Sequence, residues 1–347
     1  MTLKPILLVL FIPALMLSAC VRQPQDCARA NVLCAGLVTD FGPVTDGINQ
    51  EAWLGLQAAQ DAHLVDRIDA IETIDARDRA RNISTFADDG YDVIITVGPS
   101  ISDETVAASR KYPKLLFIGV EQPQDPVLPN LTGLVFNEDR SGFLSGALAA
   151  LITQTNRVAA LCEEDFIDPM RRYCDGFQAG AKYINPGLNV SVSYREGSQD
   201  NLFNDPKWGR TTALGVIDQG ADVVFAAGGA TGDAALETAA QQKVIVIAAE
   251  ADPYVRLADV RPKLISSAIN DIRSGILELM GQIRERKISS GNFFGQTRLA
   301  PFHEWERQIP QGTKDRLNLL EKGLEDGSIK TGIPWLKNNA PTPSPSD

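Results

Sequence analysis

Short, strongly apolar stretches alternate with longer segments of helical periodicity along most of the sequence. The apolar stretches are bounded by glycine, proline or charged residues and predict buried parallel strands, whereas the periodic segments predict helices that cover a sheet. We expect strands at 35–38, 67–74, 91–97, 115–120, 134–136, 157–162, 190–194, 222–226 and 244–248. Helices are expected from about 49 and at 78–90, 103–111, 177–183, 207–219 and 233–241. This alternation excludes all-α and all-β folds and predicts a parallel, doubly wound α/β protein.

The alternation occurs in two successive sets, which predicts two similar lobes. A helix rich in small residues is expected at 140–153 between the sets, where Gly142 and Gly146 would allow close helix packing. We expect the segment 263–267, with a helix at 271–283, to return to the first lobe, and 293–299 to cross again to the second. The expected N-terminal lobe comprises 33–136 and 269–292, and the C-terminal lobe 137–268 and 293–336.

The first strand-loop-helix unit, at 33–56, is a candidate binding region. Its apolar run ends at Asp40, a loop rich in glycine and proline follows, and a helix begins near Asn49. Ligands of open α/β sheets bind beyond the carboxyl ends of the strands, where loop side chains and helix N-termini meet. Asp40, Asp46 and Asn49 are therefore candidate ligand-binding residues. A helix cap formed by Asp46 or Asn49 explains those two residues equally well.

Polar groups follow the ends of other predicted strands in both halves of the chain. They are Ser100 in the first lobe, and Asp168, Phe203, Asp205, the turn 228–232 with Gly228 and Gly229, and the segment 250–252 with Glu250 in the second. The glycine-rich turn lets backbone N–H groups approach a ligand, carboxylates suit sugar hydroxyls, and Phe203 or Trp208 can stack on a flat ring. An ordinary tight turn explains the glycines as well, and a buried helix face explains Trp208.

Charge and missing motifs restrict the range of functions. The chain has 44 acidic and 33 basic residues, a net charge of −11, and no basic run, which argues against nucleic acid as a partner. It contains no P-loop, no strand leading into GxGxxG and no GxSxG motif. The two histidines, His63 and His303, are expected at the surface or in the core. We therefore expect no catalytic residues, no metal and no cofactor.

The first twenty residues have the pattern of a bacterial lipoprotein signal peptide. Lys4 precedes an apolar core at 6–17, and the sequence Leu-Ser-Ala then leads into Cys20. We expect residues 1–19 to be removed, Cys20 to carry lipid on its thiol and amino group, and 20–32 to form a linker. Such an anchor would hold the protein on the extracytoplasmic side of a membrane. The alternative is an ordinary cleaved signal with a chance cysteine.

The remaining four cysteines fall into two local pairs. We predict the disulfides Cys27–Cys34 and Cys162–Cys174, which suit an oxidising compartment. Zinc binding is the alternative, but neither spacing is CxxC and no histidine is near. The segment 337–347, rich in proline and serine, is expected to be a disordered tail.

Four motifs occur in an order that identifies a family. They are LVTD at 37–40 followed by DGINQ at 46–50, FLSGALAA at 143–150, GFQAGAK at 176–182, and GADVVF at 220–225 followed by AGG at 227–229. Together they resemble the basic membrane protein family of lipoprotein substrate-binding components of ABC importers, which includes purine nucleoside receptors. The resemblance extends from about Leu33 to Leu279.

The resemblance implies a type I periplasmic-binding-protein fold, with two Rossmann-like lobes, three crossovers and a ligand cleft that closes by hinge motion. Its implied partners are a nucleoside-like or sugar-like ligand and an ABC permease, and the implied state is a monomer. Nucleoside-binding members carry an acidic residue and a lysine at positions that correspond here to Glu250 and Asn270. We add Asn270 to the candidate binding residues. Asn270 in place of lysine, and Gly47-Ile48 in place of Ser-Phe, leave a non-nucleoside ligand open.

Three functions are compatible with these patterns to different degrees. The first is a lipid-anchored solute receptor that performs no chemistry and serves an importer. The second is a ligand-sensing module for a membrane signalling partner, which would use the same cleft. The third, an α/β enzyme, is disfavoured because no nucleophile, base, metal or cofactor motif is assembled.

Overall fold

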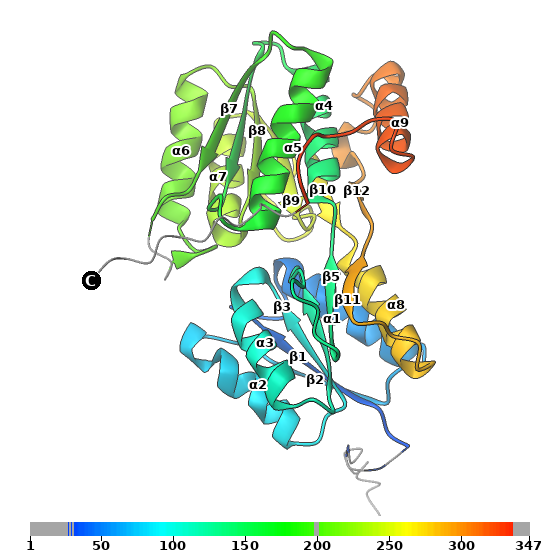
Figure 1. Ribbon diagram of the computed structural model, residues 1–347. Coiled ribbons are helices and arrows are strands. Elements are labelled where there is room, and N and C mark those ends of the chain that lie inside the picture. Colours follow the sequence, from blue (N-terminus) through cyan, green and yellow to red (C-terminus); the bar gives the residue numbers. More distant parts are fainter. Residues whose placement is uncertain (1–26, 28, 30, 198–200, 336–347) are drawn as a thin grey trace, which may run out of the picture.

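The chain folds into two lobes joined at one side by extended crossings (Figure 1). The computed structural model describes residues 27, 29, 31–197 and 201–335. The expected signal peptide, Cys20 and the tail at 337–347 lie outside the described residues. Each lobe is built on a six-stranded sheet with helices on both faces, so the predicted two-lobed α/β fold is confirmed.

The N-terminal lobe has an all-parallel sheet in the order β11-β5-β4-β3-β1-β2. Its strands are β1 (Cys34–Thr39), β2 (Arg67–Ile71), β3 (Val93–Val97), β4 (Leu116–Val120), β5 (Leu131–Val135) and β11 (Gly291–Phe294). Helices α1 (Gly47–Asp61) and α8 (Ile272–Arg284) pack on one face, and α2 (Arg79–Asp88) and α3 (Ser102–Lys111) on the other. Because both faces are covered, strands such as β1 and β3 are buried throughout and mostly apolar.

The C-terminal lobe repeats this plan in the order β12-β10-β9-β8-β6-β7. Its strands are β6 (Arg157–Cys162), β7 (Asn189–Tyr194), β8 (Val223–Ala227), β9 (Ile245–Glu250), β10 (Leu264–Asn270) and the short antiparallel β12 (Thr297–Leu299). Helices α4 (Glu138–Ile152), α5 (Asp168–Ile184) and α9 (Gln311–Glu325) cover one face. Helices α6 (Pro206–Asp218) and α7 (Gly229–Gln241) cover the other.

Three segments carry the chain between the lobes. They lie between β5 and α4, between β10 and α8, and between β11 and β12. The segment 263–267 belongs to the C-terminal sheet, so only the helix that follows it returns to the N-terminal lobe. The expected lobe boundaries at 268/269 and 292/293 fall two residues before the corresponding strand ends at Asn270 and Phe294.

Helices α4 and α5 pack unusually closely because glycines face each other. A Cβ atom added at Gly146 would overlap the backbone of Phe177, and one added at Gly180 would overlap the backbone of Phe143. This is the close approach that the small-residue helix predicted. The predicted disulfides Cys27–Cys34 and Cys162–Cys174 are both present, with Cα–Cα distances of 5.7 and 6.3 Å.

Several local expectations differ from the structure. The strand expected at 134–136 begins already at Leu131 and ends at Val135. Strand β2 ends at Ile71 rather than at residue 74. The helix expected at 177–183 begins earlier, at Asp168. Pro169 suits the first turn of a helix, because N–H groups in that turn have no partner within the helix and proline has no N–H. The stretch 228–232 is not a turn, since Gly228 has a φ of 123° and α7 begins at the next residue.

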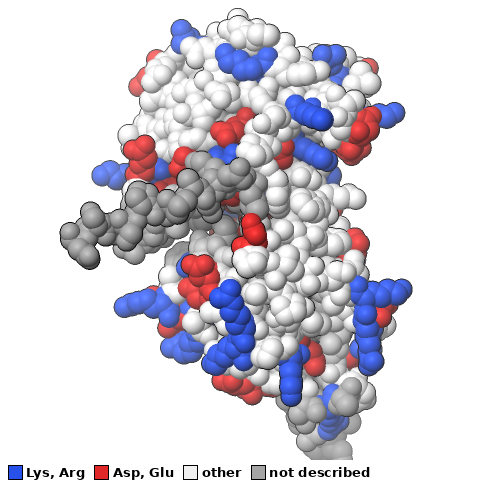
Figure 2. Space-filling model, in the orientation of Figure 1, with Lys and Arg blue, Asp and Glu red and all other residues white. Residues whose placement is uncertain are grey.

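The surface bears mixed charge. Figure 2 shows Lys and Arg side chains interspersed with Asp and Glu on the visible face.

No helix in the described part of the chain has the length and apolar character needed to cross a bilayer.

Candidate ligand-binding cavity between the lobes

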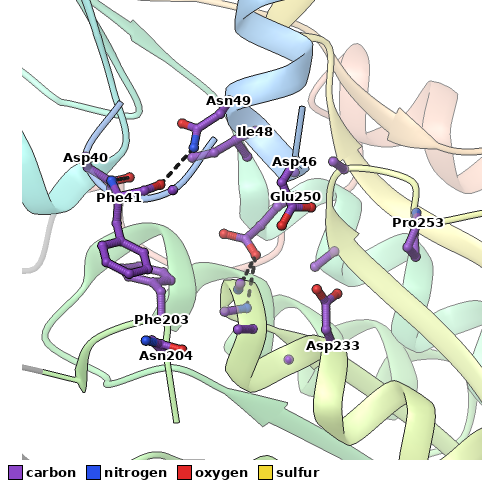
Figure 3. A pocket seen from close by; sticks show the side chains of 18 of the residues that line it. Asp40, Phe41, Asp46, Ile48, Asn49, Phe203, Asn204, Asp233, Glu250 and Pro253 are labelled. Atoms are coloured by element: carbon purple, nitrogen blue, oxygen red, sulfur yellow. Dashed lines mark hydrogen bonds between the residues drawn. The ribbon is translucent and has the colours of Figure 1, made fainter. Parts of the chain in front are cut away.

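A cavity of about 200 Å³ lies where the strand ends of the two lobes face each other (Figure 3). The N-terminal lobe contributes loops after β1 and β3 together with the start of α1. The C-terminal lobe contributes the 202–204 segment, the β8–α7 junction and the end of β9. The lining residues with polar or aromatic side chains are Asp40, Phe41, Asp46, Asn49, Arg79, Ser100, Phe203, Asn204, Asp233, Glu250 and Arg256.

Most of the candidate binding residues line this cavity. They are Asp40, Asp46, Asn49, Ser100, Phe203, Gly228, Gly229 and Glu250. Asp205 and Asn270 are not among the lining residues. The Asp205 side chain accepts from the N–H of Trp208 at 3.0 Å and caps α6, while the Asn270 amide donates to Glu121 at 2.8 Å. Asp168 opens α5 and pairs with Arg171 at 2.5 Å.

The N-terminal wall is organised by two side chains that donate to backbone carbonyls. The Arg79 guanidinium, at the start of α2, donates to the carbonyl oxygens of Asp40 at 2.9 Å and Ser100 at 2.8 Å. The Asn49 amide donates to the carbonyl oxygen of Phe41 at 2.9 Å. Burial raises the pKa of Asp40 to about 6, although the nearby Arg79 opposes this. These contacts fix the loop after β1 and present Phe41, whose side chain is 48% exposed.

Glu250 is the central acidic group of the C-terminal wall. Its Oε2 accepts from the backbone N–H groups of Gly228 at 3.0 Å and Gly229 at 3.2 Å. Glu250 ends β9 with a φ of 69°, a conformation that non-glycine residues rarely adopt and that often occurs at functional sites. Burial raises its pKa to about 8, and the negative charge of Glu121 adds to the shift.

Phe203 reaches the cavity from a loop held by buried carboxylates. Its backbone N–H donates to Glu163 at 3.0 Å, and Glu163 also pairs with Arg195 inside the lobe. The φ of Phe203 is 60°, which turns the chain sharply before α6. Phe41 lines the cavity from the N-terminal lobe and Phe203 from the C-terminal lobe, and their rings overlap in the view of Figure 3. Aromatic residues in both walls suit a ring-shaped ligand that contacts both lobes.

One cation connects the lobes at the cavity. Arg256, in the loop after β9, makes two hydrogen bonds to the carboxylate of Asp233, at 2.6 and 2.9 Å. Its Nε lies 2.9 Å from Oδ1 of Asp46 in the N-terminal lobe. This bridge ties the start of α1 to the C-terminal lobe.

Several lining residues were not predicted from the sequence: Phe41, Arg79, Asp233 and Arg256. Phe41 immediately follows Asp40, so the strand-end argument already applied to it. Arg79 and Asp233 lie in helices and Arg256 lies in a loop, and none of them gave a local signal. Their role depends on how helices and loops from distant parts of the sequence approach each other.

The arrangement of polar groups favours binding over catalysis. Ser267, Asp252 and His303 do come together, but Asp252 stands between the other two, accepting from Ser267 at 3.0 Å and contacting His303 Nε2 at 2.7 Å. A catalytic triad requires the histidine between serine and carboxylate. Across the described residues, no group of three or more His, Cys, Asp or Glu side chains is placed to hold a metal ion.

Comparisons with known proteins agree with this architecture. The family model described as ABC transporter substrate-binding protein PnrA-like (Bmp) matches residues 35–294. The ABC transporter nucleoside-binding protein BmpA of Lactococcus lactis is 31% identical over 207 residues, which cover 58% of this chain and 56% of that protein. The CD4+ T-cell-stimulating antigen of Listeria innocua is 29% identical over 219 residues, covering 61% and 59%. The matched region thus spans less than two thirds of these relatives.

A solved structure shares the fold. It is an ABC transporter system solute-binding protein from Aeropyrum pernix K1, with a TM-score of 0.72 and 19% identity, covering 86% of this chain and 92% of that one. The predicted periplasmic-binding-protein fold is therefore confirmed. Since the family model matches most of the chain, this protein belongs to the PnrA-like family of ABC transporter substrate-binding proteins, as its motifs predicted.

Proposed function

We propose that this protein is a lipid-anchored extracytoplasmic receptor that binds a nucleoside-like molecule between its lobes and delivers it to an ABC permease. The single observation that carries the proposal is the convergence of Phe41 and Phe203 from opposite lobes on a cavity bordered by Asp40 and Glu250. Aromatic rings in both walls suit a flat heterocycle, and carboxylates suit the hydroxyl groups of a sugar.

The family relation supports this ligand class. A relative in Lactococcus lactis is described as nucleoside-binding, and the motifs LVTD and DGINQ that open this chain's first lobe contribute Asp40, Asp46 and Asn49 to the cavity wall. Gly47, Ile48 and Asn270 differ from the residues that the family pattern has at these positions. The exact ligand must therefore be identified by a screen that includes sugars, bases and amino acids.

Ligand binding in a two-lobed receptor is coupled to closure because the ligand contacts both lobes. Here the Arg256–Asp46 bridge already crosses the cleft at 2.9 Å. We propose that this bridge assists the closed form, which a permease would distinguish from the open one.

A thermal-shift screen of the purified protein against nucleosides, bases, sugars and amino acids tests the proposal. A ligand at a hundred times its dissociation constant stabilises the native state by about 2.7 kcal/mol, which raises the melting temperature measurably. We expect purine nucleosides to give the largest shift and Phe203→Ala to reduce it. Leu319→Ala, an exposed position on α9, is the matched control. Response to another ligand class alone would contradict nucleoside binding.

The anchor is tested separately. We expect the protein to fractionate with membranes when expressed in a lipoprotein-processing bacterium, and Cys20→Ala to release it. If the Cys20→Ala protein stays with the membrane fraction, anchoring through that cysteine is wrong. The result does not depend on the identity of the ligand.

A further inference from the structure

A second cavity, of about 260 Å³, adjoins the principal one. The two cavities share Pro99, Ser100 and Leu202 in their walls, so a ligand in one can extend toward the other. The second cavity has largely apolar walls, including Pro123, Phe166 and Ile167. Its ionisable lining residues are Glu121 and Asp168, and no Lys, Arg or His lines it among the described residues.

Glu121 provides an acceptor oxygen that lacks a partner. The side chain follows β4, is 1% exposed and lines the second cavity. Its Oε1 accepts from the Asn270 amide at 2.8 Å, but its Oε2 has no hydrogen-bond partner within the described part of the chain. The Oδ1 of Asn270 is likewise buried without a partner there. Buried polar atoms are rarely left unpaired, so the oxygen of Glu121, which lines the second cavity, marks a place where a ligand can supply a donor.

No ion pair joins Glu121 to a cation in the described part of the chain. Arg172 is the basic group that lowers the pKa of Glu121; its Nη2 donates to the carbonyl oxygen of Phe136 at 2.6 Å and to Glu138, and its Nη1 is buried without a hydrogen-bond partner there. The same guanidinium lies 3.8 Å above the ring of Trp335. Asp168, the other carboxylate of the cavity, is paired with Arg171 at 2.5 Å. Glu121 is therefore the acidic group of this cavity that retains an unpartnered oxygen.

We propose that the second cavity receives a protonated amine of the ligand, which pairs with Glu121. The inference rests on the proposed function, because it places the body of that ligand in the principal cavity. An ammonium group has three donors and no acceptor, so it can donate to the unpaired oxygen of Glu121 and needs no acceptor supplied by a donor group. A carboxylate or phosphate of a ligand would instead face Glu121 with like charge.

A change in the protonation of Glu121 is a second measurable effect that the proposal predicts. Burial, with the negative charge of Asp40 adding to it, raises the pKa of Glu121 to about 7, while Asn270 and Arg172 oppose the shift. Glu250 and the Tyr173 hydroxyl are further titratable groups that interact with it. Near neutral pH the empty site thus holds a proton part of the time. A bound ammonium favours the carboxylate form, so the carboxyl proton passes to the buffer.

Matched ligand pairs test the proposal by isothermal titration calorimetry at pH 7.5. The probes are adenosine and its 2′-amino, 3′-amino and 5′-amino deoxy analogues, measured in buffers of different ionisation enthalpy. We expect at least one amine to bind the wild-type protein about tenfold tighter than adenosine, with proton release. In Glu121→Gln this affinity ratio should fall to near one, whereas the exposed control Asp103→Asn should keep it.

The outcomes separate this inference from the proposed function. If adenosine binds and no amine binds more tightly, the amine subsite is wrong and nucleoside binding stands. If no nucleoside binds, the proposed ligand class fails. In that case the binding of 1,4-diaminobutane tests the subsite alone. Binding that is lost in Glu121→Gln would support the subsite, and no detectable binding to the wild-type protein would overturn it. Should Glu121→Gln not fold, Asn270→Lys supplies an internal ammonium instead, and retention of the amine preference there would contradict the proposal.

Discussion

In the N-terminal wall of the principal cavity, donor side chains hold backbone carbonyls, whereas in the C-terminal wall carboxylates hold backbone N–H groups. Arg79 and Asn49 fix the loop that carries Phe41. Glu163 fixes the N–H of Phe203, and Glu250 fixes the β8–α7 junction. Guanidinium and amide groups keep one protonation state in the ordinary pH range, but buried carboxyl groups do not. Asp40 in the N-terminal wall has a pKa raised to about 6 and Glu250 in the C-terminal wall a pKa raised to about 8, so the comparison indicates that the C-terminal wall responds at higher pH.

The largest expected effect comes from breaking the buried support of Phe203. Glu163→Ala leaves the buried Arg195 without this partner and should destabilise the protein by about 3–5 kcal/mol, measured by urea unfolding. Glu196→Ala, at an exposed neighbouring position, should change stability by no more than about 0.5 kcal/mol. Equal effects of the two substitutions would show that the Glu163 contact does not support this wall.

The N-terminal wall has its own test. Arg79→Ala removes the two charged hydrogen bonds to the carbonyls of Asp40 and Ser100, and we expect a loss of roughly 1.5–3 kcal/mol in urea unfolding. Arg79→Lys keeps the charge and should recover only part of that loss, because an ammonium lacks the guanidinium's planar fork of donors. Full recovery would mean that charge alone holds the loop.

The pH dependence of stability sharpens the contrast. A carboxyl group whose native pKa is raised stabilises the fold while protonated and loses that contribution as pH rises through the native pKa. For Glu250, with a native pKa of about 8, the loss runs from about pH 4.5 to 8, with a slope of at most about 1.4 kcal/mol per pH unit. Glu250→Gln should flatten this decline, whereas Asn49→Asp leaves Glu250 in place and should retain it. An unchanged pH profile in Glu250→Gln would contradict the assignment.

The smallest effect is expected at the bridge between the walls. Asp46→Ala removes the contact with Arg256 and leaves the Arg256–Asp233 pair in place. The Asp46 side chain is 51% exposed, so the stability change should stay below about 1 kcal/mol. The readout is small-angle X-ray scattering, where the variant should show a larger radius of gyration if the bridge helps to hold the lobes together. Arg273→Ala, an ion-pair residue within the N-terminal lobe, is the control. If both variants have the same radius of gyration, the bridge does not hold the lobes together.

Much of the fold could be predicted because both sheets are covered on both faces. Strands such as those expected at 91–97 and 115–120 had to be mostly apolar, and the glycines of the helix at 140–153 indicated the close contact with α5. The predicted start of α7, at residue 233, was wrong because the sequence from Gly228 to Gly232 resembles that of a turn. In the structure only Gly228 and Gly229 have positive φ, and the rest is helical.

The binding cavity was predictable only where it follows strand ends. Asp40, Ser100 and Glu250 were found because parallel strands bring their carboxyl ends to one edge. Arg79, Asp233 and Arg256 were missed because their positions depend on the approach of helix starts and loops across the cleft. Glu121 was missed because its burial and its unpaired oxygen are properties of the folded cleft.

The most direct test of ligand binding between the lobes is a double-mutant cycle measured by calorimetry with the best purine nucleoside of the screen. Phe41→Ala and Phe203→Ala should each cost about 1–3 kcal/mol of binding free energy, the usual range for stacking of a base on an aromatic ring. Because both rings contact one ligand, the double variant should show a coupling energy that differs from zero. A full loss of affinity in one variant and none in the other would contradict a ligand held by both lobes.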